Sequence, residues 1–170
     1  MNKAVEVALK YVGQKELPNN VFDPNSDFGK KMKAVGHQDG HAWCALFAEL
    51  VFKEAYPEKF DELDKLFSAS AVQTYKNFTH KDNGLGYSEN GLPEVGNLVI
   101  WQLYKDGQPQ WQGHAGIVHS LKSSWEFTSI EGNTNEAGSR EGVTVAIKER
   151  KVLKGVWNGL KVLGFIRIGG

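Results

Sequence analysis

The chain has 170 residues and no formal net charge, because 20 Lys and Arg residues balance 20 Asp and Glu residues. This balance excludes the strongly basic surface that nucleic-acid-binding proteins use. Apolar residues make up 41% of the chain and charged residues 24%, which excludes an intrinsically disordered protein. One core is sufficient at this length, so we expect a single domain over residues 1–170 that acts as a monomer.

The first half of the chain predicts helices. Apolar residues recur at intervals of three and four along several segments, which end at glycine, proline or turn-forming residues. Residues 17–41 are rich in Pro, Asn and Gly, so they predict a loop region with at most one short helix. The expected helices are residues 4–12, 28–35, 42–56, 58–67 and 69–78, followed by a turn near residues 83–91.

The second half, after Pro93, predicts β-strands. Its apolar segments are short and rich in β-branched and aromatic residues, with Gly, Asn or Lys-Asp-Gly turns between them. Helices followed by a run of strands predict an α+β fold, with N-terminal helices on an antiparallel sheet of about five to six strands. The expected strands are residues 98–101, 115–119, 125–130, 143–147 and 162–168.

Cys44 is the only cysteine, so an intramolecular disulfide is excluded and the thiol needs another explanation. It lies at the start of the clearest helix pattern, shortly after Asp39 and Gly40, which break a helix. Unpaired backbone N–H groups and the positive end of the helix dipole favour a thiolate at such a position. A buried structural cysteine is the alternative.

A nucleophilic cysteine needs a base, and the base needs a polar group that orients it. His114 lies at the start of a predicted strand, between small residues that leave room around its ring. Glu131 and Asn133 follow at the end of the next strand, where either side chain could accept a hydrogen bond from the second ring nitrogen. The alternatives are a surface histidine and a solvated strand end.

Four segments together resemble the CHAP family, the cysteine- and histidine-dependent amidohydrolases/peptidases, which have a papain-like fold. One departure is Gly96-Asn97, where the family commonly has Gly-Asp. The resemblance extends from the first helix to the last strand. The segments are residues 42–47, 96–101, 113–118 and 130–133.

The resemblance implies cleavage of an amide bond in bacterial peptidoglycan through a thioester acyl-enzyme, without a cofactor. The cleaved bond would be that of an N-acetylmuramoyl-L-alanine amidase or of an endopeptidase acting on stem or cross-bridge peptides. The resemblance also implies a role for each site residue: Cys44 as nucleophile, His114 as base, Glu131 as orienting acid and Asn133 as a nearby polar support.

Further candidates concern the oxyanion and the substrate groove. The backbone N–H of Cys44 can donate to an oxyanion, because amides at a helix start are unpaired. The side chain of Gln38 is a second candidate, by similarity to the glutamine of papain-like enzymes. Trp43, Trp101 and Trp111 are candidates for the substrate groove, with a position in the core or at its rim as the alternative.

Two other functions compete with thiol catalysis. His37, His41 and Cys44 have a spacing that could place two imidazoles and a thiolate around zinc, although Asp39 and Gly40 interrupt a helix there. The second competitor is a non-catalytic module of the same fold that binds peptidoglycan or a partner. Such a module has no need of a base beside a thiol.

The start of the chain has Glu6 where a signal peptide would have its apolar run, and no segment approaches the roughly 20 apolar residues of a membrane span. We therefore expect a protein made in the cytoplasm that acts on the cell wall after release or delivery. This fits a phage lysin or a delivered effector, for which a holin, a secretion machine or an immunity protein is a candidate partner.

Overall fold

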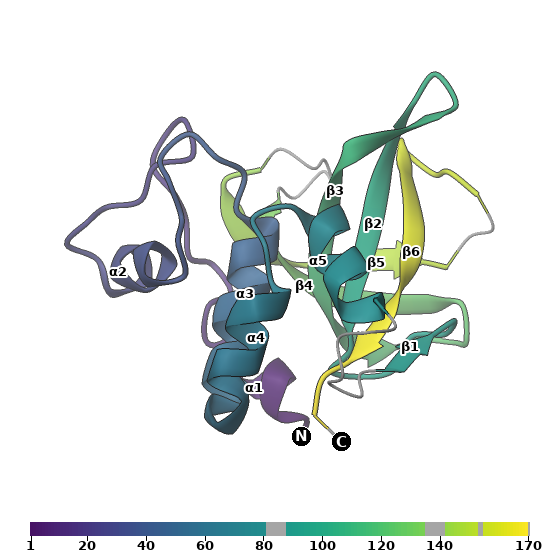
Figure 1. Ribbon diagram of the computed structural model, residues 1–170, viewed down its shortest axis with the longest axis horizontal. Helices are drawn as coiled ribbons and strands as arrows, with labels where there is room; N and C mark the ends of the chain where they lie inside the picture. The colour runs from purple at the N-terminus through teal and green to yellow at the C-terminus, as the bar shows by residue number, and fades with distance from the viewer. Residues whose placement is uncertain (81–87, 135–141, 153–154, 170) are drawn as a thin grey trace.

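The computed structural model describes residues 1–80, 88–134, 142–152 and 155–169, with the backbone alone for 88–90 (Figure 1). Helices precede strands along the chain, as the sequence predicts. The helices are α1 (Lys3–Leu9), α2 (Asp27–Ala34), α3 (Cys44–Ala55), η1 (Pro57–Lys59, a 3-10 turn), α4 (Phe60–Leu66) and α5 (Ala71–Thr79). The strands are β1 (Ser88–Asn90), β2 (Leu98–Lys105), β3 (Gln108–Leu121), β4 (Glu126–Thr134), β5 (Thr144–Lys151) and β6 (Leu160–Arg167).

The strands form one antiparallel sheet in the order β1-β6-β2-β3-β4-β5. β2 to β5 are neighbours in chain order, and β6 returns to pair with the free side of β2. The turn between β2 and β3 contains Asp106 and Gly107, whose φ values of 51° and 76° are those that a two-residue hairpin needs. The predicted α+β class and number of strands are therefore confirmed.

The bounds of several elements differ from the sequence prediction. β3 begins at Gln108 and ends at Leu121, because hairpin pairing with β2 continues through polar residues beyond the apolar segment. The predicted turn near residues 83–91 lies in part outside the described residues, and its last part contains the short β1. The helix predicted from residue 42 begins at Cys44, which is therefore its first residue.

Helix α3 is the centre of the core between the helices and the sheet. Each of its residues except Glu54 is buried, as expected for a helix that is enclosed on all sides. Its buried charges are paired, since Lys53 Nζ lies 2.6 Å from a carboxylate oxygen of Glu49 and 2.6 Å from one of Asp64. In the described part of the chain, no helix has the length and apolar character that crossing a membrane requires.

A smaller apolar cluster covers the opposite face of the sheet. Residues alternate between the two faces along each strand, so Leu98 and Ile100 join the helix-side core while Val99 and Trp101 join the second cluster. Its other buried members are Val118, Phe127, Leu160 and Phe165.

Gly132 in β4 allows α3 to approach the sheet closely. A Cβ at this position would lie 2.6 Å from Cζ3 of Trp43 and 2.7 Å from Cβ of Phe47, well inside contact distance. Trp43 directly precedes Cys44, and Gly132 directly follows Glu131. This contact therefore sets the distance between the helix and the strand that carry the candidate catalytic residues.

We predict that Gly132→Ala lowers the free energy of unfolding by about 1–3 kcal/mol, because the added methyl group overpacks this contact. Denaturant unfolding measures the change. Gly91→Ala is the matched control, since Gly91 is exposed and an added Cβ would have no atom within 4 Å. This control should stay within about 0.5 kcal/mol of the wild type. Equal stability of the two variants would contradict the packing argument.

Candidate active site

The thiol of Cys44 lies at the N-terminus of α3. Trp43 occupies the N-cap position and, within the described part of the chain, makes no side-chain capping bond, so amides of the first turn remain available. The backbone amides of Ala45 and Ala115 hydrogen-bond to the sulfur and favour its anion. The fold thus places the thiol between the helix start and β3, as an amide-lined anion site requires.

His114 in β3 is fully buried and is held by Glu131. Its Nε2 lies 2.8 Å from Oε2 of Glu131 in β4. Gly116 makes this contact possible, since a Cβ there would lie 2.8 Å from Cγ of the glutamate. The glycine two residues after the histidine thus leaves space for the glutamate side chain to pass across β3.

The contact with Glu131 leaves Nδ1 of His114 for the thiol. Nδ1 is buried, and the ring and the thiol interact through both charge and a hydrogen bond, each of which favours the ion pair. Catalytic hydrogen bonds are often long in a free enzyme and shorten when substrate binds.

Charge at this site favours a thiolate beside an imidazolium. Burial raises the pKa of Cys44, but the positive charge of His114 and the amide hydrogen bonds outweigh burial, so this pKa is lowered. Burial lowers the pKa of His114, but the charges of the thiolate and of Glu131 outweigh it and raise this pKa to about 9. Both shifts favour a proton on the imidazole rather than on the sulfur.

The carboxylate of Glu131 is the most highly hydrogen-bonded group of the site. Besides His114, it accepts bonds from Nε and Nη2 of Arg150, at 2.7 and 2.5 Å, and from Oγ of Ser129 at 2.5 Å. Burial raises the pKa of Glu131, but these bonds from Arg150 and the charge of His114 lower it to about 2. Glu131 is therefore an anion at any pH at which the protein works.

Arg150 is the site residue that sequence reasoning missed. The run of charges at the end of β5 looks like an exposed edge, but burial alternates along it. Lys148 and Arg150 are buried, and Glu149 and Lys151 are exposed. The sequence did contain a signal for Arg150. A buried carboxylate needs a cation as its partner, and the alternation of residues between the two faces of a strand places Lys148 and Arg150 on one face.

The sequence left open whether Glu131 or Asn133 orients the histidine, and the structure brings only Glu131 into contact with it. Asn133 is buried, has a φ of 53°, and neither polar atom of its amide has a hydrogen-bond partner among the described residues. Gln38 is exposed in the loop between α2 and α3, and no hydrogen bond joins its side chain to the described site residues.

The expectation that Trp43 lines an open groove is wrong. Trp43 is fully buried against Phe47, and its Nε1 donates a hydrogen bond to a carboxylate oxygen of Glu16. Trp101 is 4% exposed in the cluster on the far face of the sheet. Both rings are large apolar surfaces whose burial stabilises the fold. Trp111 is 74% exposed in β3, and Trp101, although mostly buried, lines a pocket with Arg150 and Trp157.

The possible zinc ligands do not form a cluster. Nε2 of His37 lies 3.1 Å from the carbonyl oxygen of His41, which occupies one ring nitrogen of the first candidate ligand. Within the described ranges, no three His, Cys, Asp or Glu side chains are placed to hold a metal ion.

We predict that His114→Gln slows alkylation of Cys44 by iodoacetamide at pH 7 about tenfold or more. Without the cation the thiol returns toward an ordinary pKa of about 8.5, where only a few per cent is thiolate at pH 7. His119→Gln is the control, because His119 lies on the same strand and contacts Thr128 through Nδ1 at 3.0 Å. Equal rates in the two variants would show that His114 does not activate the thiol.

The comparison with protein families agrees with this geometry. A model of the CHAP domain matches residues 36–133, more than half of the chain, and the matched segment contains Cys44, His114, Glu131 and Asn133. No curated protein matches the chain at a significant level. The chain belongs to the CHAP family, the cysteine- and histidine-dependent amidohydrolases/peptidases.

Proposed function

We propose that this protein hydrolyses an amide bond of bacterial peptidoglycan, with Cys44 as the nucleophile. The family is generally catalytic and typically acts on the cell wall. The observation that supports the proposal best is the buried series Cys44, His114 and Glu131, whose charges favour a thiolate at neutral pH. A module that only binds has no use for three buried ionisable groups in this order.

The proposed reaction begins with attack of the Cys44 sulfur on the scissile carbonyl carbon. A carbon–sulfur bond forms, and the carbonyl oxygen becomes an oxyanion that the backbone N–H of Cys44 is placed to stabilise. When the carbon–nitrogen bond breaks, the His114 imidazolium donates its proton to the leaving amine. The acyl group then remains on sulfur as a thioester.

Water completes the cycle. The neutral His114 takes a proton from a water molecule, which attacks the thioester carbon and releases the carboxylic acid product and the thiolate. Glu131 remains ionised throughout, so it orients the ring and stabilises the imidazolium without exchanging a proton. This division of roles follows from its low pKa.

Three further residues have proposed substrate roles. The amide of Asn133, which has no hydrogen-bond partner among the described residues, carries the NH2 donor and carbonyl acceptor that complement a peptide group. The exposed indole of Trp111 is suited to stack on a sugar or a peptide side chain. Gln38 stays a candidate second oxyanion donor, which requires its side chain to turn toward Cys44.

The first test is digestion of purified peptidoglycan. We predict that the wild type solubilises the walls and that Cys44→Ala releases no detectable fragments while remaining folded by circular dichroism. Mass spectrometry of the fragments then distinguishes an amidase from an endopeptidase, because the new amino terminus differs. Solubilisation by the Cys44→Ala variant would refute the proposal.

The second test is the pH dependence of kcat/KM. Activity should fall above about pH 9, where the imidazolium of His114 loses its proton. On the acid side, activity should persist below the ordinary thiol pKa of about 8.5, because the pKa of Cys44 is lowered. An enzyme that gains activity only as a histidine of ordinary pKa, near 6.5, becomes neutral would contradict the ion-pair mechanism.

A further inference from the structure

We propose that Arg150 is a positioning residue that holds Glu131 as an oriented anion, and so fixes the orientation of His114 and balances the charge of the buried site. Arg150 lies outside the segment that matches the family, residues 36–133, so the family assignment gives it no role. Its relevance to catalysis rests on the proposed function. Its effect on the thiol can be measured without any substrate.

Arg150 contacts Glu131 through two hydrogen bonds. Nε donates to Oε1 at 2.7 Å and Nη2 donates to Oε2 at 2.5 Å, so the guanidinium engages both oxygens. A contact through two parallel bonds prevents rotation of the carboxylate. Oε2 is thereby kept 2.8 Å from Nε2 of His114.

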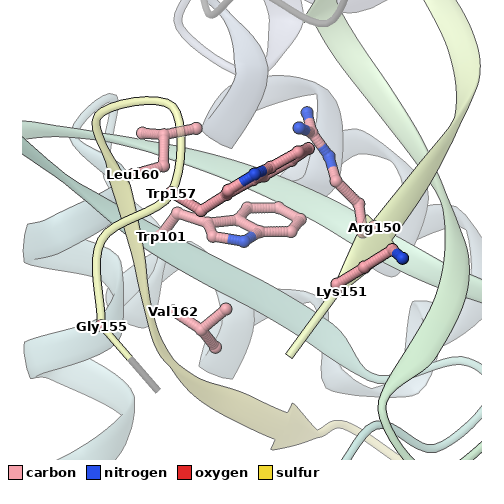
Figure 2. A pocket seen from close by; sticks show the side chains of 7 residues that line it. All are labelled: Trp101, Arg150, Lys151, Gly155, Trp157, Leu160 and Val162. Atoms are coloured by element: carbon pink, nitrogen blue, oxygen red, sulfur yellow. The ribbon is translucent and has the colours of Figure 1, made fainter. Parts of the chain in front are cut away.

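The side chain of Arg150 is itself held in place by the residues packed around it. It is buried, and its guanidinium carbon lies 5.1 Å from the centre of the Trp101 ring. That ring is stacked on Phe127, with centroids 6.5 Å apart, and lies 5.7 Å from the ring of His114. Figure 2 shows the guanidinium beside the indoles of Trp101 and Trp157, which line a pocket on the far face of the sheet.

The charges of the buried site balance one another. The thiolate of Cys44 and the carboxylate of Glu131 carry two negative charges, and His114 and Arg150 carry two positive ones. Without Arg150 the site has a net charge of −1 away from water. The excess negative charge of this buried site then raises its affinity for a proton, whether the thiolate, the imidazole or the carboxylate accepts it.

Other charged groups near the site have contacts of their own. Lys148 lies on the same face of β5 and pairs in register with Ser129, whereas α3 contributes Glu49 and Lys53, which pair with each other. Glu16 contacts the indole N–H of the residue before Cys44. Among the described residues, Arg150 is the cation that binds Glu131 through both oxygens.

The test is the rate of Cys44 alkylation by iodoacetamide as a function of pH. Arg150→Met should raise the pH midpoint by about one unit or more, because the lost cation favoured the deprotonated thiol. Arg150→Lys keeps the charge, so its midpoint should stay near that of the wild type. Its kcat on peptidoglycan should still fall about tenfold, because an ammonium group cannot make the two-bond contact.

Lys53→Met is the matched control. It also removes a buried cation that lies between carboxylates, but in the body of α3. A general loss of stability would affect this variant as well, whereas the midpoint should shift only in Arg150→Met. If Arg150→Met does not fold, Arg150→Gln makes the same change of charge with a polar side chain.

An unchanged midpoint in a folded variant without the charge would overturn the proposal, and so would full kcat in Arg150→Lys. The outcome also separates this proposal from the proposed function. If the midpoint shifts as expected but the wild type does not digest peptidoglycan, the positioning role holds and the substrate assignment fails.

Discussion

The structure depends on one buried carboxylate. Glu131 would be costly to bury as an anion in an apolar environment, and its four hydrogen bonds from three strands compensate that cost. β3 supplies His114, β4 supplies Ser129 and β5 supplies Arg150. Because the glutamate contacts side chains of all three strands, the same contacts that link β3, β4 and β5 also orient the histidine.

Close packing completes the site from the side of the helices. Gly116 leaves room for the glutamate side chain, and Gly132 lets α3 approach β4 until its N-terminus lies beside His114. Only then do the amides at the helix start and the imidazolium act on the same sulfur. The reactivity of Cys44 is thus a property of the tertiary structure, since the helix N-terminus and the imidazolium act on it together.

Much of this could be predicted from the sequence, because the signals were local. The apolar periodicity placed a helix from near Cys44, and small residues around His114 indicated that there is room around its ring. Arg150 escaped prediction because its importance comes from a partner 19 residues away on a neighbouring strand. Trp43 was misplaced for a related reason, since it packs against Gly132, which is far from it in the sequence.

The charges of the resting site favour a thiolate beside an imidazolium. The most direct measurement is the ultraviolet absorbance of the thiolate across a pH titration, taken as the difference between the wild type and Cys44→Ser. We expect thiolate to be present already at pH 7, with a midpoint clearly below the ordinary thiol value of about 8.5. A midpoint at or above that value would show that the resting thiol is protonated and that His114 does not activate it.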